Sequence, residues 1–191
     1  MYDCIIVGGG IAGLQAAIQL GRYNRRTLVV DRGDGRSSLC RKYRNVLGYP
    51  DGVAGPDLRA VGRRQAGAYG VRFVDGEATQ IDKEDFGFRI RCTMGDGRES
   101  LFEGRAVLLA TGVKDRFPPL SGLRECLGLT VYICPDCDGH ETAGRRTVVM
   151  GSGNAGASMA AALSYFGGDL VFVNHDAAEV SGPGRVATLP T

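Results

Sequence analysis

The stretch YICPDCDGHE, residues 132–141, carries the most reactive group of side chains in the sequence. Two cysteines, Cys134 and Cys137, are separated by two residues, and Asp138 follows directly. Thiols at this spacing can close a small disulfide ring, and a helix that begins at or just after Cys134 would lower the pKa of a thiol through the field at its N-terminus. Asp138 could carry protons to and from a departing thiolate. The pattern predicts a redox-active dithiol with an acid beside it.

Two other interpretations of these cysteines stay open at this point. Cys126, Cys134, Cys137 and His140 could supply four zinc ligands, and the pair could also be two inert thiols. A second close pair of cysteines would make the zinc interpretation specific, and the sequence has none. We therefore expect redox chemistry and assign no metal site.

A glycine-rich loop, Gly8-x-Gly10-x-x-Gly13, follows the short apolar run at residues 3–7 and precedes a helical pattern. The first glycine permits a tight turn, the second lets backbone approach a pyrophosphate, and the third lets helix and strand pack closely. The helix N-terminus offers N–H groups and partial positive charge to phosphates. Asp31, at the end of the next predicted strand, can accept hydrogen bonds from ribose hydroxyls. This segment predicts a dinucleotide site.

A second loop, Gly151-x-Gly153-x-x-Gly156, repeats the same template later in the chain. Asp176 lies at the end of the following predicted strand, where an acid favours an unphosphorylated ribose, whereas a 2′-phosphate requires a nearby arginine. No arginine follows the loop until Arg185. If this loop binds a nicotinamide nucleotide, the local charge favours NADH over NADPH.

The elements that must position these motifs form two β-α-β units, so the expected fold class is α/β with two Rossmann-like units. Antiparallel strands are inserted into the first domain, and the second domain is incomplete. A linker with Pro118-Pro119 at residues 113–122 places the domain boundary, giving domains 1–114 and 115–191. The expected strands cover residues 3–7, 26–31, 71–74, 77–81, 86–92, 99–103, 105–112, 131–133, 145–150 and 169–176, and the expected helices 14–23, 56–69 and 157–166.

Composition argues against several classes of function. The 191 residues carry a formal net charge of +2, too small to indicate a nucleic-acid or anionic-membrane partner. No run of about 18 apolar residues occurs, so no segment is predicted to span a membrane. The N-terminus lacks the pattern of a secretory signal. Six cysteines are too few for a disulfide scaffold, which indicates a reducing, cytoplasmic setting.

The order of motifs resembles the low-molecular-weight thioredoxin reductase family of flavoprotein disulfide oxidoreductases. GGGIAG, an ATG turn at residues 110–112, CPDCD and GSGNAG follow one another over residues 3 to about 176. The resemblance implies FAD at the first loop, in the 1–114 domain, and NAD(P)H at the second. It places Asp31 at the adenosine ribose, Asn45 near the flavin, and Thr111 and Gly112 against the flavin dinucleotide.

The resemblance also implies an activity, in which electrons pass from NAD(P)H through FAD to the dithiol and on to a thioredoxin-like protein or a small disulfide. Cys137 would be the sulfur nearest the flavin, Cys134 would attack the substrate disulfide, and Asp138 would be the acid. The nucleotide domain would rotate relative to the flavin domain, with a hinge around residues 113–122. A homodimer is compatible with the resemblance.

The sequence departs from the family pattern in three places, and these departures leave alternative functions open. Asn174-His175-Asp176 replaces the basic run that grips a 2′-phosphate. CPDCDGHE replaces the commoner CATCDG, and related flavoproteins that oxidise dithiols with oxygen also vary here, so a dithiol oxidase is one alternative. The family's return to the flavin domain is missing, so we expect a truncated form that holds FAD weakly or not at all. The second alternative is an inactive fragment with a zinc-binding cysteine cluster.

Overall fold

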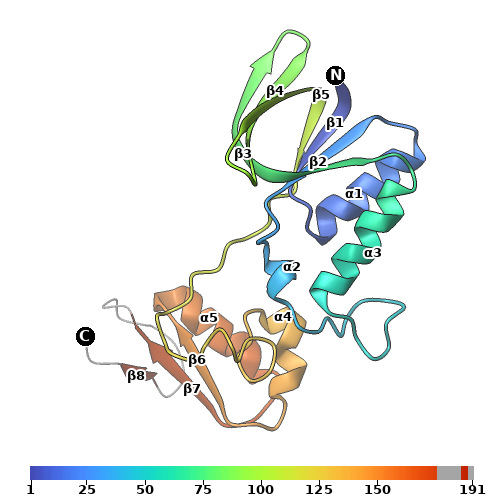
Figure 1. The fold of residues 1–191 in the computed structure, drawn as a ribbon. Coiled ribbons are helices and arrows are strands. Elements are labelled where there is room, and N and C mark those ends of the chain that lie inside the picture. Colours follow the sequence, from blue (N-terminus) through green and yellow to red (C-terminus); the bar gives the residue numbers. More distant parts are fainter. Residues whose placement is uncertain (176–185, 189–191) are drawn as a thin grey trace. The chain divides into compact units, whose positions relative to one another are not determined.

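The computed structural model of the chain describes residues 1–175 and 186–188. The chain divides into two compact units, Met1–Leu129 and Thr130–Thr191, and each is described here by itself (Figure 1). Within the described ranges, the helices are too short or too polar to cross a membrane.

The first unit extends past residue 114, where the sequence placed the domain boundary. The guanidinium of Arg36 pairs with the carboxylate of Asp115, and Arg41 Nη2 donates to the carbonyl oxygen of Glu125 at 2.9 Å. These contacts join residues 115–125 to residues 36–41, so both segments belong to the first unit. Composition cannot reveal such long-range contacts, and two apolar side chains of the segment are buried as well, namely Leu123 and Leu127.

Five strands of the first unit close into a ring in the order β1-β2-β3-β4-β5. Parallel pairing joins β1 to both β2 and β5 and joins β2 to β3, whereas β4 runs antiparallel to β3 and β5. Figure 1 shows β3 and β4 as a long ribbon that curls over the other strands. The bounds are Tyr2–Val7 (β1), Thr27–Asp31 (β2), Arg72–Glu84 (β3), Gly87–Met94 (β4) and Glu99–Leu109 (β5).

The sequence predicted breaks in β3 and β5 that the structure does not contain. In β3 the chain changes from parallel pairing with β2 to antiparallel pairing with β4 at Gly76, where a Cβ would lie 2.8 Å from the Thr93 carbonyl oxygen. In β5 the pairing with β4 gives way to pairing with β1 at Gly104, where a Cβ would lie 2.9 Å from Ile5 Cγ1. Each glycine therefore permits close approach inside a continuous strand instead of ending it.

Two helices, α1 (Ile11–Arg22) and α3 (Gly55–Gly67), lie side by side next to the ring, and a short α2 (Arg36–Leu39) precedes α3 (Figure 1). Strand side chains alternate between two cores. Ile6 and Val29 pack with Ala17 of α1 in one core. Ile5 and Leu28 pack in the other with side chains of the antiparallel strands, so both faces of β1 and β2 are buried.

The second unit holds a three-stranded parallel sheet in the order β6-β7-β8. Val149 of the first strand and Phe172 of the second form its core with Ala160 and Leu163 of α5. This unit repeats the β-α-β order of the first, so the expected α/β fold with two such units is confirmed. The strand expected at residues 131–133 is not formed. The bounds are Pro135–Asp138 (α4), Gly139–Thr142 (η1, a 3₁₀-helix), Thr147–Gly151 (β6), Gly153–Ser164 (α5), Leu170–Asn174 (β7) and Val186–Thr188 (β8).

Candidate functional site

The first glycine loop joins β1 to α1, and its three motif glycines have different neighbours. Gly8 has φ +108°, and a Cβ there would overlap the carbonyl oxygen of Ala110. A Cβ on Gly13 would overlap the carbonyl oxygen of Gly8. Gly10 caps α1 with φ −74°, and among the described residues a Cβ there would meet only Ser37 Oγ, at 3.8 Å. The fold itself requires glycine at positions 8 and 13, whereas the space beside position 10 can admit a ligand.

The ligand best suited to this space is an anion. The N-terminus of α1, a helix of 12 residues, points its unpaired backbone N–H groups there, and its first turn contains no acidic side chain. A pyrophosphate needs these two properties, close backbone approach and a partial positive charge. The residues of the first loop therefore fit the phosphates of FAD.

The ATG turn lies against the same loop. The backbone N–H of Ala110 donates to the carbonyl oxygen of Val7 at 2.8 Å, which continues the β1–β5 pairing by one residue. A Cβ on Gly8 would come within 3.2 Å of the Thr111 backbone nitrogen. Thr111 and Gly112 are exposed, and Gly112 has φ +69°. The structure thus brings the start of the predicted turn to the first glycine of the loop.

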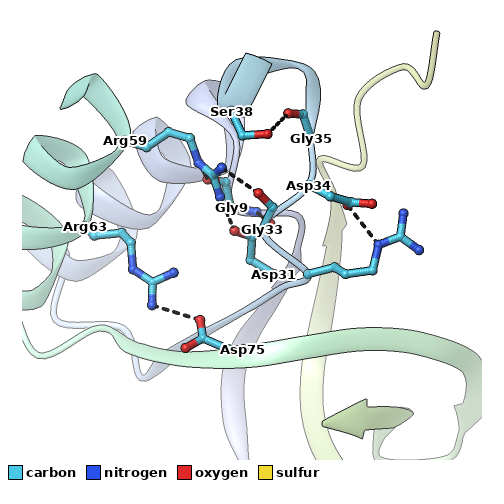
Figure 2. A network of polar contacts seen from close by, with 10 residues as sticks. Gly9, Asp31, Gly33, Asp34, Gly35, Ser38, Arg59, Arg63 and Asp75 are labelled. Atoms are coloured by element: carbon cyan, nitrogen blue, oxygen red, sulfur yellow. Dashed lines mark hydrogen bonds and ion pairs between the residues drawn. The ribbon is translucent and has the colours of Figure 1, made fainter. Parts of the chain in front are cut away.

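Asp31 stands at the end of β2 and contacts the loop directly (Figure 2). Its Oδ1 accepts a hydrogen bond from the Gly9 backbone N–H at 3.0 Å. Its Oδ2 accepts one from Arg59 Nη2 at 2.5 Å, and the side chains of Asp31 and Arg59 are only 10% and 12% exposed. The acid therefore lies where the sequence predicted it, but it has a buried arginine partner that the motif did not indicate.

Asn45 belongs to the first unit and lies on an exposed loop. The base of this loop is closed by an isolated antiparallel bridge between Tyr43 and Val53, whose two backbone N–H···O distances are 2.7 and 2.9 Å. The bridge fixes the two ends of the loop, and the role of Asn45 near a flavin stays a prediction.

The second glycine loop joins β6 to α5 and repeats the packing of the first. A Cβ on Gly151 would come within 2.7 Å of Gly156 Cα, and one on Gly156 within 2.6 Å of the Phe172 ring. Gly153 has φ +50°, and a Cβ there would have no neighbour within 4 Å among the described residues. The first turn of α5 contains no acidic side chain. The second loop can therefore accept an anion in the same way.

The end of β7 carries the residue of the second unit that corresponds to Asp31 in the first. Asp176 lies outside the described residues. In the β6–β7 register Gly151 pairs with Asn174, and Asn174 lies as many residues after Gly151 as Asp31 lies after Gly8. Asn174 is 3% exposed, and its Oδ1 accepts a hydrogen bond from the Gly153 backbone N–H at 3.0 Å. A neutral amide thus takes the position that a carboxylate holds in the first unit.

The cysteine pair lies at the start of α4. Cys134 caps this helix in an extended conformation, Pro135 is its first residue, and the backbone N–H of Asp138 donates to the Cys134 carbonyl oxygen at 3.0 Å. The helical turn brings Cys137 Sγ to 2.7 Å from Cys134 Sγ, and Cys137 is exposed. The two sulfurs are close enough to exchange between dithiol and disulfide with little movement.

The described ranges contain no group of three or more His, Cys, Asp or Glu side chains arranged to hold a metal ion. Within the second unit, Cys134, Cys137 and His140 are accordingly not gathered as three ligands of one metal ion. Two other cysteines, Cys4 and Cys92, differ from the Cys134–Cys137 pair in that their side chains are buried, and burial raises the pKa of both thiols.

Comparison with known proteins agrees with this arrangement. A family model described as pyridine nucleotide-disulphide oxidoreductase matches residues 2–183. The chain belongs to this family. The resemblance to thioredoxin reductases that the motif order indicated is confirmed, and family membership implies FAD and a pyridine nucleotide without distinguishing NADH from NADPH.

Two curated relatives and one solved structure illustrate the similarity. The thioredoxin reductase of Treponema pallidum (strain Nichols) is 36% identical over 165 residues, which cover 85% of this chain and 52% of that protein. The thioredoxin reductase of Aquifex aeolicus (strain VF5) is 31% identical, over 91% of this chain and 53% of that protein. The crystal structure of thioredoxin reductase from Streptococcus pyogenes MGAS5005 is 25% identical with a TM-score of 0.82, covering 99% of this chain and 63% of that one. The chain spans about half the length of these two curated relatives.

Two side chains that bond to residues of the glycine loops, Asn174 and Arg59, were not indicated by the sequence motifs, and each left a usable signal. Asn174 lies as far after Gly151 as Asp31 lies after Gly8, so the spacing from the first glycine indicates it. The predicted acid, Asp176, lies two residues later. Arg59 lies on the same face of α3 as Gly62 and the fully buried Ala66, by helical periodicity. A charged residue on a buried helix face indicates a buried partner.

Proposed function

We propose that this protein is an FAD-dependent disulfide reductase that uses a nicotinamide nucleotide to reduce the Cys134–Cys137 pair and, through it, a disulfide substrate. The observation that carries the proposal is the 2.7 Å separation of the two sulfurs at the start of α4, in a chain with two dinucleotide-type loops. When bound, FAD would supply the hydride-transfer chemistry that a dithiol lacks.

The first loop is the proposed FAD site. The N-terminus of α1 and the open space at Gly10 would receive the pyrophosphate, and Asp31 would accept hydrogen bonds from the adenosine ribose. Thr111 and Gly112 would lie against the dinucleotide, and Asn45 near the flavin. These roles rest on the resemblance to thioredoxin reductases and on the packing of the loop against β5 and β2.

The two cysteines take different roles in the proposed reduction. The Cys134 thiolate would attack the substrate disulfide, forming a mixed disulfide and releasing one substrate thiolate, which Asp138 would protonate. Cys137 would then attack Cys134, closing the 134–137 disulfide and releasing the second substrate thiol. The substrate gains two electrons, and the pair loses two. The names of the curated relatives support thioredoxin as the substrate disulfide.

The second loop is the proposed nicotinamide nucleotide site, with NADH preferred over NADPH. The sequence has no lysine or arginine between Arg146 and Arg185, and β7 ends on the neutral Asn174 followed by His175. A 2′-phosphate would lack a cationic partner there. Equilibrium titration with each nucleotide tests this preference, and tighter binding of NADPH would contradict it. His175→Arg should tighten NADPH binding by about tenfold, the effect of roughly one charge-assisted hydrogen bond.

A coupled assay tests the whole proposal. The full chain is mixed with saturating FAD, NADH and a small aromatic disulfide, and thiol release and nucleotide consumption are followed together. The proposal predicts that the wild type consumes one nucleotide for each disulfide reduced. The Cys137→Ser variant should neither consume nucleotide nor release thiol. Oxygen uptake on adding a dithiol, with no nucleotide consumed, would instead establish the dithiol oxidase.

A further inference from the structure

One arginine outside all the motifs is tied into the first glycine loop. Arg59, near the start of α3, donates from Nε to the Gly9 carbonyl oxygen at 3.3 Å, from Nη1 to the Gly33 carbonyl oxygen at 3.0 Å, and from Nη2 to Asp31 Oδ2 at 2.5 Å. Figure 2 shows this side chain reaching from the helix to all three groups. A single guanidinium thus joins α3, the loop after β1 and the turn after β2.

This ion pair differs from its neighbour one helical turn away. The Arg59 and Asp31 side chains are 12% and 10% exposed, whereas those of Arg63 and Asp75 are 35% and 81% exposed, with a longer Nη2–Oδ1 distance of 3.1 Å. Exposed pairs contribute little because water screens them, but removing one partner of a buried pair leaves the other charge without compensation. Removing Arg59 should therefore destabilise the Asp31 carboxylate far more than removing Arg63 would destabilise that of Asp75.

Gly9 is held from both sides by the same pair. Its N–H donates to Asp31 Oδ1 at 3.0 Å, and its carbonyl oxygen accepts from Arg59. A Cβ on Gly9 would lie 2.8 Å from the Asp31 side chain, so loop and carboxylate are also in close contact. Arg32, although adjacent to Asp31 in sequence, pairs with Asp34 and Glu77. The position of the carboxylate thus depends on Arg59.

We propose that Arg59 is a positioning residue of the dinucleotide site, which holds the Asp31 carboxylate and the Gly9 peptide in the arrangement that receives the adenosine ribose of FAD. The inference rests on the proposed assignment of FAD to the first loop. A carboxylate has about four acceptor positions, so Asp31 keeps capacity for ribose hydroxyls after bonding Gly9 and Arg59. The Arg59 guanidinium, bonded to Oδ2, keeps the carboxylate oriented when a ligand excludes water.

Equilibrium titration of the full chain with FAD tests the proposal, with every variant checked for folding by circular dichroism. Arg59→Gln should raise the dissociation constant for FAD by roughly 10–100-fold, the usual effect of removing a group that orients a ligating side chain. Arg59→Lys should give an intermediate value, because one ammonium cannot reach three separate oxygens. Arg63→Gln is the matched control, with the same chemical change on the same helix, and should bind FAD like the wild type.

Hydrogen exchange of the Gly9 amide, measured without ligand, provides an independent result. The amide should exchange faster in Arg59→Gln than in Arg63→Gln, because its acceptor Asp31 is no longer held. Equal FAD affinity in the Arg59 variants and the wild type would overturn the proposal, and tighter binding would show that Arg59 competes with the ribose. If the wild type holds too little FAD to titrate, Gly9 exchange alone decides, and unchanged exchange in Arg59→Lys and Arg59→Gln would overturn the role of Arg59.

Discussion

Burial sorts the cysteines of this chain into reactive and protected thiols. Cys137 is exposed beside Cys134, whereas Cys92 is completely buried inside the ring of strands and Cys4 is buried in β1. Removal from water disfavours the thiolate, which raises the pKa of both buried thiols. Because the thiolate is the nucleophile, the buried thiols should be poor ones near neutral pH.

Pulse alkylation of the native protein checks this ordering. At mildly alkaline pH, Cys137 should react with iodoacetamide well before Cys4 and Cys92, which should react only after unfolding. Because burial raises the pKa of Cys4 and Cys92, a rise in pH that leaves the protein folded should not start their labelling. Peptide mass spectrometry gives the order, and early labelling of Cys92 would contradict the burial of this side chain.

Asp138 should act through proton transfer. Asp138→Asn keeps the size of the side chain but removes its capacity to donate and accept a proton, so release of the substrate thiol should slow by roughly 10²–10⁴. Stopped-flow measurement of thiol release provides the rate. Asp136→Asn, on the same short helix, is the control and should retain the wild-type rate. An unchanged rate in Asp138→Asn would limit this residue to a structural role.

At the scale of elements, the glycines of one loop should separate into two classes. Gly13→Ala should lower the free energy of unfolding by roughly 1–3 kcal/mol or more, because its Cβ would overlap the Gly8 carbonyl oxygen. Gly10→Ala should cost less than about 1 kcal/mol, the usual loss for alanine at a helix N-cap, but should weaken FAD binding. Urea unfolding and FAD titration measure the two effects, and wild-type FAD affinity in Gly10→Ala would contradict the proposed pyrophosphate site.

Two helical glycines should respond in opposite directions to the same substitution. A Cβ on Gly21 of α1 would lie 2.8 Å from Tyr69 Cβ, so Gly21→Ala should destabilise the fold by roughly 1–3 kcal/mol. At Gly67, at the end of α3, such a Cβ would have no neighbour within 4 Å among the residues that the structure describes, so Gly67→Ala should stabilise the fold by roughly 0.4–1 kcal/mol. Urea unfolding measures both, and a common sign would contradict the packing of α1 against the segment that follows α3.

Sequence patterns predicted the β-α-β units because strand, glycine loop and helix follow one another locally. They did not predict continuous β3 and β5, since Gly76 and Gly104 look like breaks until their partner strands are known. Arg59 was missed for a related reason, because its partners lie on segments distant in sequence. The local residue pattern is enough to predict most helices and strands. The contacts that hold Asp31 and the glycine loop depend on residues from distant parts of the sequence.

For the whole molecule, the division into units separates the proposed functions. The first loop and Asp31 belong to the Met1–Leu129 unit, and the second loop and the cysteine pair belong to the Thr130–Thr191 unit. The proposed reaction therefore requires electrons to reach the dithiol from a cofactor that the other unit holds. The chain covers 52% and 53% of the two curated relatives named above, so an assay with saturating FAD avoids dependence on how tightly this length of chain holds the cofactor.

Anaerobic reduction of the oxidised full chain tests this requirement directly. The protein is incubated with NADH, with or without saturating FAD, and the thiols formed are counted at each cysteine by differential alkylation and mass spectrometry. With the proposed electron path, Cys134 and Cys137 should both become thiols only when FAD is present, while the labelling of Cys92 should not change. If the pair stays oxidised with FAD and NADH together, or is reduced equally without FAD, the proposed electron path is wrong.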